Sequence, residues 1–62
     1  MQITLKVRKN DSGRYTLMEQ AEGERMPRDC DGDLFMNLDA GSFYRAVASK
    51  LHQAHFNGDE VG

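Results

Sequence analysis

Hydrophobic and polar residues alternate along the start of the chain. Within QITLKVRK, residues 2–9, Ile3, Leu5 and Val7 fall on one side and polar residues on the other. This alternation is typical of a half-buried strand. RYTLMEQA, which begins at residue 14, alternates in the same way. The intervening NDSG suits a three-residue turn in which Gly13 takes the left-handed conformation. The two segments therefore predict an antiparallel hairpin.

The turn also predicts the register of this hairpin. A three-residue turn places Lys9 opposite Tyr15 and Val7 opposite Leu17, so that the apolar residues of both strands share one face. A four-residue turn would place Val7 opposite Thr16 and would divide the apolar residues between the two faces. The register of the three-residue turn is therefore the predicted one.

A long polar connection, EGERMPRDCDGD, follows the hairpin and contains the only proline. After it, the alternation in DLFMNL, residues 33–38, predicts a third short strand. Leu34, Met36 and Leu38 would point inward, and Phe35 would point outward.

The period changes to that of a helix from Ala40 or Ser42 onward. Asp39 or Ser42 can cap the helix start, and Asn57-Gly58 is a natural end. We expect residues 59–62 to be a flexible tail. The predicted apolar stripe of the helix is Phe43, Tyr44, Val47, Leu51 and Ala54.

The order of elements predicts an α+β fold: a single domain over residues 1–58, with a three-stranded antiparallel sheet packed on one C-terminal helix in β-β-β-α order. The predicted core is Ile3, Leu5, Val7, Tyr15, Leu17, Leu34, Met36, Leu38, Phe43, Val47 and Leu51. The succession of hairpin, polar loop, short strand and helix resembles the amino-terminal domain of HicB-type antitoxins. ERMPRDCDGDLF differs from the proline-rich and glycine-rich segment that follows the hairpin in that family. The resemblance is therefore one of architecture and implies no residue roles.

The size of the chain limits its means of stabilisation. A domain of 62 residues buries only about 60% of its unfolded surface, and small domains are often aided by disulfides, a metal or oligomerisation. Cys30 is the single cysteine, so no internal disulfide can form. One free thiol, with no apolar run long enough to cross a bilayer and no export signal, favours a cytoplasmic location without membrane association.

Charge is unevenly distributed along the chain. Residues 1–14 contain four cations and one carboxylate, whereas residues 15–39 contain seven carboxylates and two cations. The sequence therefore predicts a basic hairpin beside an acidic loop.

The acidic loop resembles the start of a calcium-binding loop. Asp29, Asp31 and Asp33 have the spacing of the first three ligands of such a loop. The sixth position, however, is Leu34 in place of glycine, and the twelfth is Ala40 in place of glutamate. The loop is therefore interpreted as an acidic turn that binds no calcium.

No other residues indicate a metal, a cofactor or catalysis. The neighbouring carboxylates make Cys30 a poor nucleophile, and no CxxC motif accompanies it. His52 and His55 have helical spacing but lack further metal ligands. When charged, they would interact favourably with the helix dipole near its C-terminus. There is no catalytic motif and no phosphate-binding glycine loop. The prediction is a protein without enzymatic activity or cofactor.

The leading hypothesis is a small cytosolic protein that binds another protein as a regulator, adaptor or inhibitor. A phage-borne or plasmid-borne accessory protein would fit this size and polarity. Acidic residues around an exposed aromatic residue suit a basic partner, or a surface that normally receives a nucleic-acid backbone. A homodimer that buries Met18 and Phe35, with Tyr44 at its margin, is also expected. The predicted interface consists of Met18, Phe35, Glu19, Glu22, Glu24, Asp29, Asp31 and Asp33.

The alternative hypothesis is a nucleic-acid-binding module. The outer face of the hairpin carries cations, and two-stranded ribbons do bind nucleic acid. Against this hypothesis, the first two strands have no aromatic residue on that face, and the sequence pI is about 5.5. The residues predicted for this role are Lys6, Arg8, Lys9 and Arg14.

Overall fold

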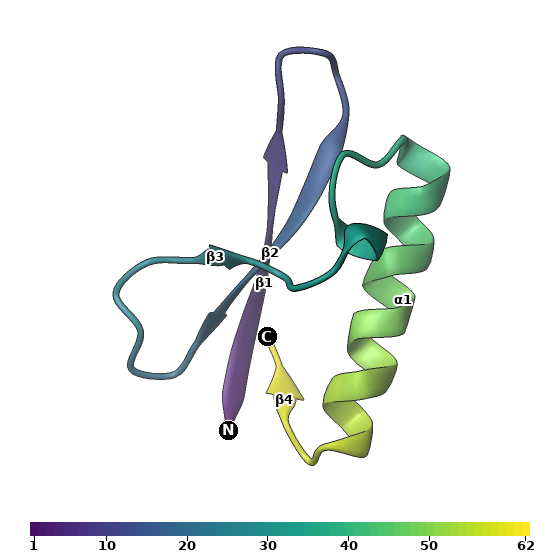
Figure 1. The fold of residues 1–62 in the computed structure, drawn as a ribbon. Coiled ribbons are helices and arrows are strands. Elements are labelled where there is room, and N and C mark those ends of the chain that lie inside the picture. The colour runs from purple at the N-terminus through teal and green to yellow at the C-terminus, as the bar shows by residue number, and fades with distance from the viewer.

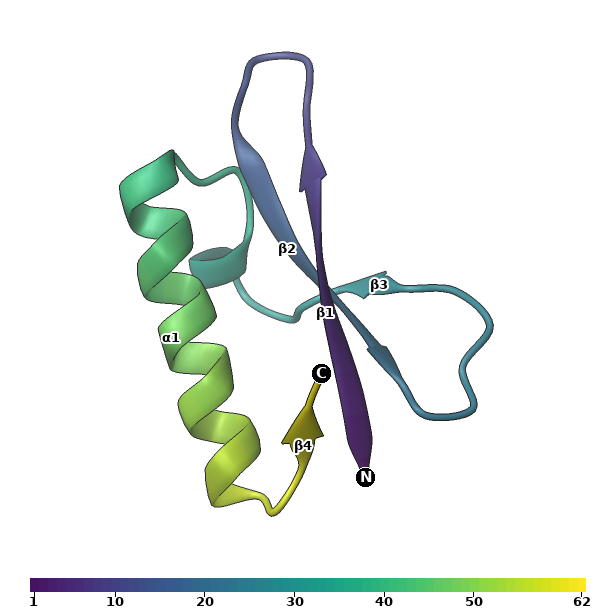
Figure 2. The same cartoon turned by 180° about the vertical axis from the view of Figure 1, so that it is seen from behind.

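The computed structural model describes residues 1–62 and has a four-stranded mixed sheet with one helix on one of its faces (Figures 1 and 2). The strands lie in the order β3-β2-β1-β4. Pairing is antiparallel between β1 and β2 and between β2 and β3, whereas β4 joins β1 in parallel. The α+β class is confirmed, and the expected sheet of three antiparallel strands is corrected to a mixed sheet of four. The strands are β1 (Gln2–Lys9), β2 (Tyr15–Ala21), β3 (Arg28–Asp29) and β4 (Glu60–Val61).

The hairpin of β1 and β2 has the predicted register. Val7 lies opposite Leu17, and Lys9 lies opposite Tyr15. At the turn, Gly13 has φ 82°, and its N–H donates to the carbonyl of Asn10 over 3.0 Å. The alternation of side chains and the glycine turn therefore agree on one pairing.

The predicted strand at residues 33–38 is wrong. Asp33–Phe35 form a short 3-10 helix, η1, and Asn37 has φ 52°. Successive side chains of such a turn do not alternate between two faces as they do in a strand. Phe35 therefore points inward and is only 5% exposed, whereas Leu34 is 56% exposed.

Two shorter pairings replace that strand along the edge of β2 that faces away from β1. Arg28–Asp29 form β3, in which Asp29 lies opposite Met18. Farther along the chain, Tyr15 and Leu38 exchange two backbone hydrogen bonds of 2.8 and 2.7 Å. The chain thus meets β2 twice, with η1 between the two contacts (Figure 1).

The helix α1 (Ala40–Phe56) begins and ends where its capping residues predict. The carboxylate of Asp39 accepts a hydrogen bond of 2.7 Å from the backbone N–H of Ser42. At the other end, Asn57 caps the helix and Gly58 has φ 80°. This helix does not have the length and hydropathy that a membrane span requires.

The buried face of α1 agrees with the predicted stripe only in part. Ala54 is buried as predicted, but so is Ala46, which lies outside the stripe. Tyr44 and Leu51 of the stripe are instead 74% and 44% exposed. Small residues at the contact let two elements approach closely, and Ala46 packs against Phe35 and β2. The helix therefore packs on the sheet through its alanines, and the large side chains of Tyr44 and Leu51 remain exposed to solvent.

The core is correspondingly small. Its central cluster consists of Leu17, Cys30, Phe35 and Ala46. Part-buried apolar residues surround this cluster: Leu5, Leu38, Phe43 and Val47. Four residues that were predicted for the core are exposed instead: Val7, Leu34, Met36 and Leu51.

The prediction of a flexible tail at residues 59–62 is wrong. Ile3 of β1 lies opposite Val61 of β4, and the N–H of Gly62 donates to the carbonyl of Ile3 over 3.0 Å. The carboxylate of Asp59 lies 3.5 Å from the amino group of Met1. The edge of β1 offered unpaired backbone groups, and the last residues satisfy part of them.

Candidate functional site

An apolar groove separates β1 from the N-terminal half of α1. It consists of two adjoining hollows that share Val7 and Phe43. Of the residues in the groove, Val7 is 53% exposed. Large side chains that remain accessible in this way can pack against a partner. The groove is lined by Leu5, Lys6, Val7, Leu17, Phe43 and Val47. Its upper end, which is the end beside the start of α1, is lined by Tyr15, Ala40 and Tyr44.

The open edge of β1 lies beside this groove. Gln2 and Asn10, both even-numbered, make backbone hydrogen bonds across the hairpin, to Glu22 and Arg14. Because bonded pairs alternate along an antiparallel ladder, the even-numbered residues of β1 are the ones that bond to β2. The odd-numbered residues direct their N–H and C=O groups to the other edge.

β4 covers only the beginning of that edge. Its pairing with β1 is confined to Gln2 and Ile3. The backbone groups of Leu5, Val7 and Lys9 are therefore left without a neighbouring strand. We call these three residues and the adjoining apolar groove the open β1 edge.

Cations surround the open β1 edge. Lys6, Lys9, Arg14 and Arg45 are exposed, and none of them forms an ion pair with a carboxylate. The ammonium of Lys9 lies 6.0 Å from the centre of the Tyr15 ring. The edge thus combines an apolar floor with a positively charged rim.

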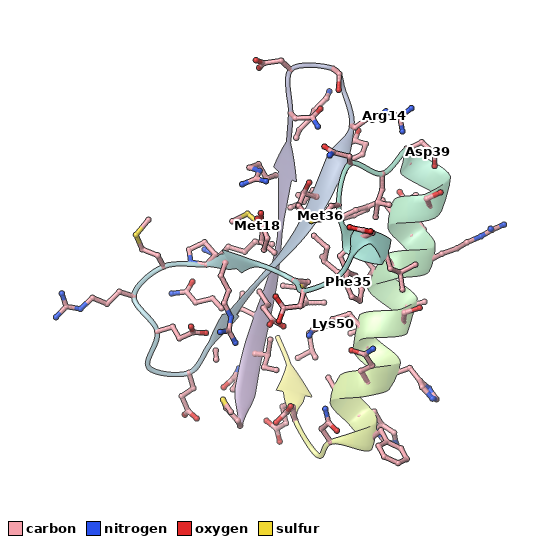
Figure 3. All side chains as sticks on the ribbon, in the orientation of Figure 1. Arg14, Met18, Phe35, Met36, Asp39 and Lys50 are labelled. Carbon is pink, nitrogen blue, oxygen red and sulfur yellow. The ribbon has the colours of Figure 1, made fainter.

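Arg14 and Arg45 lie near the start of α1, at the upper end of the groove. Figure 3 shows Arg14 close to Asp39. Hydrogen bonds from Ser42 hold the pKa of the Asp39 carboxyl below its ordinary value, and both arginines lower that pKa further. This carboxylate is engaged as the helix cap.

The acidic residues of the predicted interface are largely engaged within the molecule. The carboxylate of Glu19 lies 2.6 Å from the ammonium of Lys50 and 3.6 Å from the guanidinium of Arg28. Glu24 accepts a hydrogen bond of 2.7 Å from the N–H of Ala21. These two carboxylates thus hold α1 and the loop after β2 in place.

Asp29 is engaged as well. It forms an ion pair of 3.1 Å with Arg8, which lies on the outer face of β1. Glu22, Asp31 and Asp33 are exposed and form no ion pair. The expected acidic surface is therefore reduced to these three residues.

The apolar anchors of the predicted interface are not exposed as expected. Phe35 is buried against Leu17 and Ala46, so it cannot anchor a partner or a second copy. Met18 is half-buried and lies opposite Asp29 of β3. The predicted site residues are consequently not assembled into one surface, as Figure 3 shows for Met18 and Phe35.

The cations predicted for nucleic-acid binding lie on both faces of the sheet. Lys6 and Arg8 are on the outer face of β1, and Arg8 is paired with Asp29. Lys9 lies on the face of α1, near Tyr15. Arg14 donates to the carbonyl of Asn37 over 3.3 Å. They do not form one continuous stripe.

No three histidine, cysteine, aspartate or glutamate side chains lie together as metal ligands would. In the acidic loop, Asp29 is turned toward Arg8, and Asp33 begins η1. His52 and His55 are exposed on α1.

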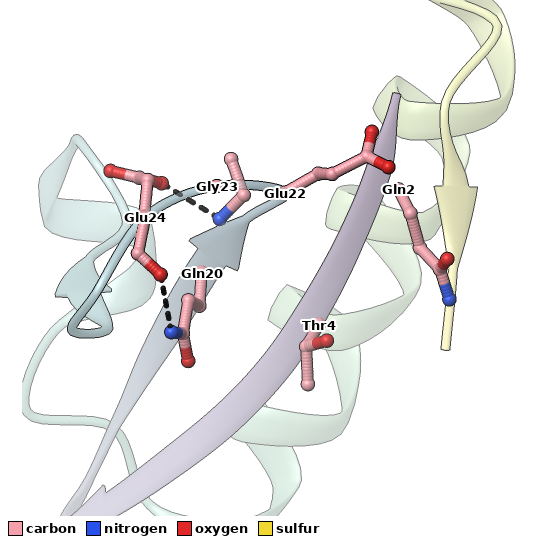
Figure 4. A pocket seen from close by; sticks show the side chains of 7 residues that line it. Gln2, Thr4, Gln20, Glu22, Gly23 and Glu24 are labelled. Carbon is pink, nitrogen blue, oxygen red and sulfur yellow. Dashed lines mark hydrogen bonds between the residues drawn. The ribbon is translucent and has the colours of Figure 1, made fainter.

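A polar hollow on the outer face, at the end of the hairpin remote from its turn, is bordered by the loop after β2 (Figure 4). The side-chain amide of Gln20 donates to the carbonyl of Glu24 over 2.8 Å. The carboxylate of Glu24 accepts from the N–H of Ala21. Two of the polar side chains at this hollow, Gln20 and Glu24, therefore close a turn of the chain itself.

Cys30 is a buried thiol beside a carboxylate. Its residue is 1% exposed, and this burial, together with the charge of Glu19, raises the pKa of the thiol to about 11. The thiolate is therefore disfavoured, as the sequence predicted.

The stability of the protein should fall as pH rises from 9.0, the ordinary pKa of the thiol, to about 11. In this range the unfolded chain loses the Cys30 proton while the folded chain keeps it, so that deprotonation favours unfolding. Urea midpoints measured below and within the range test this expectation. Cys30→Ala should show a shallower alkaline decline than the parent, and equal declines would contradict the assignment.

The open β1 edge was missed because Leu5, Val7 and Val47 were all assigned to the core. The apolar stripe of α1 has the ordinary width of a core-facing helix, so it gave no signal that Tyr44 and Leu51 remain exposed.

Comparisons with protein-family models, with curated proteins and with solved structures found no match.

Proposed function

We propose that this protein is a protein-binding module, of the kind that serves as a small regulator, adaptor or inhibitor. An extended segment of the partner adds as a strand to the open β1 edge. The observation that carries the proposal is the unpaired edge of Leu5, Val7 and Lys9 directly beside an apolar groove. Strand addition uses both features, because backbone hydrogen bonds supply affinity and alternate side chains enter pockets.

The dimensions of the edge suit a short segment. From Leu5 to Lys9, a strand rising about 3.3 Å per residue accommodates roughly five partner residues. Every second side chain of that segment would face α1 and contact Phe43 or Val47. An interface of this size is typical of transient binding rather than of a permanent complex.

The expected homodimer stays a prediction, but its interface changes because Phe35 is buried. Antiparallel pairing of two β1 edges centred on Val7 would place Lys6 of one copy opposite Arg8 of the other. Like charges directly opposite each other are destabilising. A different protein is therefore a better occupant of this edge than a second copy.

Nucleic-acid binding also stays a prediction. Lys6, Lys9 and Arg14 have no carboxylate partner, and such cations can contact phosphates. The groove between them is lined by Val7 and Phe43, and a phosphate backbone would leave these side chains without a contact. Protein binding makes use of the whole surface.

Amide spectra with a neutral strand-forming peptide test the proposal. The probe is a capped heptapeptide in which valine and threonine alternate. We expect the peptide to shift and slow the exchange of the amide protons of Leu5, Val7 and Lys9, because only these face the open edge. The amides of Lys6 and Arg8 already bond to β2 and should change little.

A matched pair of variants controls for unspecific adsorption. Val7→Lys places a charge in the groove and should abolish the response. Met26→Lys introduces the same charged residue at another exposed apolar position, in the loop between β2 and β3, where Met26 is 75% exposed. It should bind as the parent does. An edge whose amides do not respond at millimolar peptide would refute strand addition.

A further inference from the structure

The charges around the open β1 edge indicate what kind of segment it binds. Side chains at even-numbered positions of β1 project from the outer face, and those at odd-numbered positions project toward α1. Each cation near the edge can therefore be assigned to one face of an added strand. Two of them matter most, Lys6 on the outer face and Lys9 on the face of α1.

Lys6 presents its charge beside the middle of the edge. Lys6 is one of the residues that border the groove, and no carboxylate forms an ion pair with it. Its neighbour on the same face, Arg8, is already paired with Asp29 at 3.1 Å. A partner residue opposite Lys6 thus lies beside an unpaired cation. A partner residue opposite Arg8 lies beside a cation that is already paired with Asp29.

The upper end of the edge is also positively charged. Lys9 lies there over Tyr15, and Arg14 and Arg45 both act on the neighbouring carboxyl of Asp39. That carboxylate accepts a hydrogen bond from Ser42 as the helix cap. The remaining charge at this end is positive.

We propose that the open β1 edge binds an extended protein segment in which acidic and apolar residues are placed in a defined order. Opposite Leu5 and Val7 the segment carries apolar residues, and opposite Lys6 and Lys9 it carries carboxylates. The position opposite Arg8 is free to vary. This inference rests on the proposed strand addition and adds the chemistry of the partner.

The order follows from the pairing rules of sheets. Residues directly opposite each other on neighbouring strands have Cβ atoms about 4.5–5.5 Å apart, and opposite charges there stabilise the pair. The apolar positions opposite Leu5 and Val7 face Phe43 and Val47 across the groove. An acidic segment also avoids the repulsion that a second copy of β1 would bring.

Three capped heptapeptides test the chemistry of the partner. All carry valine at the two positions that would lie opposite Leu5 and Val7, and threonine opposite Arg8. The positions opposite Lys6 and Lys9 carry glutamate, threonine or lysine. We expect the glutamate peptide to bind about tenfold more tightly than the threonine peptide, and the lysine peptide to bind most weakly. The advantage of the glutamate peptide should shrink as salt is added, since exposed charges are screened.

Charge reversal in the protein provides the matched control. Lys6→Glu should remove most of the preference for the glutamate peptide and improve binding of the lysine peptide. Arg25→Glu makes the same change of charge in the loop between β2 and β3, on the far side of the sheet. Arg25 is exposed and forms no ion pair. Its variant should keep the parent's order of peptides.

The outcomes separate this inference from the proposed function. If the lysine peptide binds as well as the glutamate peptide while Leu5, Val7 and Lys9 still respond, strand addition stands and the acidic partner is refuted. If no peptide affects these amides, strand addition itself fails. Tighter binding of a seven-nucleotide single-stranded DNA would refute the acidic partner in favour of nucleic acid. Sedimentation that shows a dimer protecting the same amides would assign the edge to a second copy.

Discussion

Replacing Leu17 with alanine is expected to remove most of the stability of this domain. Leu17 is 1% exposed, and it packs against Cys30, Phe35 and Ala46 in the central cluster. Truncation of a buried leucine costs about 2–5 kcal/mol, because burial is lost and a cavity remains. A domain of this size has only about 3–9 kcal/mol of stability at ordinary values per residue. Thermal and urea unfolding followed by circular dichroism measure the loss.

Leu51→Ala is the matched control for this prediction. It makes the same change at a residue that is 44% exposed, so less apolar area returns to water and no closed cavity forms. We expect it to cost about 1 kcal/mol or less. Equal losses for the two variants would show that α1 faces the sheet with Leu51 instead of Ala46.

Replacing Lys50 with methionine should have the second largest effect. Its ammonium lies 2.6 Å from the carboxylate of Glu19, and the side chains of the pair are only 17% and 13% exposed. Removal of one partner of a buried ion pair leaves an uncompensated charge, at a cost of about 3 kcal/mol. Arg28 is 3.6 Å away and is 64% exposed, so it compensates only in part.

The double variant Glu19→Gln with Lys50→Met distinguishes a lost charge partner from lost packing. Without the carboxylate no unpaired charge remains, and we expect more than half of the lost stability to return. Arg45→Met, at an exposed and unpaired position of the same helix, should be nearly neutral. If the double variant is no more stable than Lys50→Met alone, the charge of Glu19 is not the cause of the loss.

The hairpin and the helix could be predicted because their signals are local. In the hairpin, the alternation of side chains and the glycine at residue 13 independently specify the same register. In the helix, Asp39 and Gly58 mark the two ends through their own backbone hydrogen bonds and conformation. Nothing distant in the chain is required for either element.

The remaining strands depend on partners far away in the sequence. β3 and β4 have two residues each, which is too short for any periodic signal. Residues 33–38 alternate like a strand, but Asn37 has φ 52°, and the turn of η1 directs Phe35 inward. Asparagine tolerates the left-handed conformation, and nothing in the local pattern indicates that it is used here.

The candidate site was misjudged for a related reason. Large apolar residues were assigned to the core by their size, yet Ala46 is the residue of α1 that joins the central cluster. Tyr44 and Val7 consequently border an open groove. The acidic residues were assigned to a surface, although the geometry pairs Glu19 with Lys50 and Asp29 with Arg8. Which charged side chains form ion pairs depends on how the helix and the strands pack together, and the sequence pattern does not reveal this packing.

The parallel pairing of β4 with β1 has a consequence for the order in which we expect the chain to fold. It joins Gln2 to Glu60, so it closes nearly the whole chain into one loop at a large entropic cost. The hairpin and the helix rest on local contacts and form within microseconds. We therefore expect β4 to dock last, after the hairpin edge that receives it has formed. For the same reason it should be the first strand to detach in the native state, with the fastest hydrogen exchange in the sheet. Each such opening transiently extends the unpaired edge of β1 to its first residue.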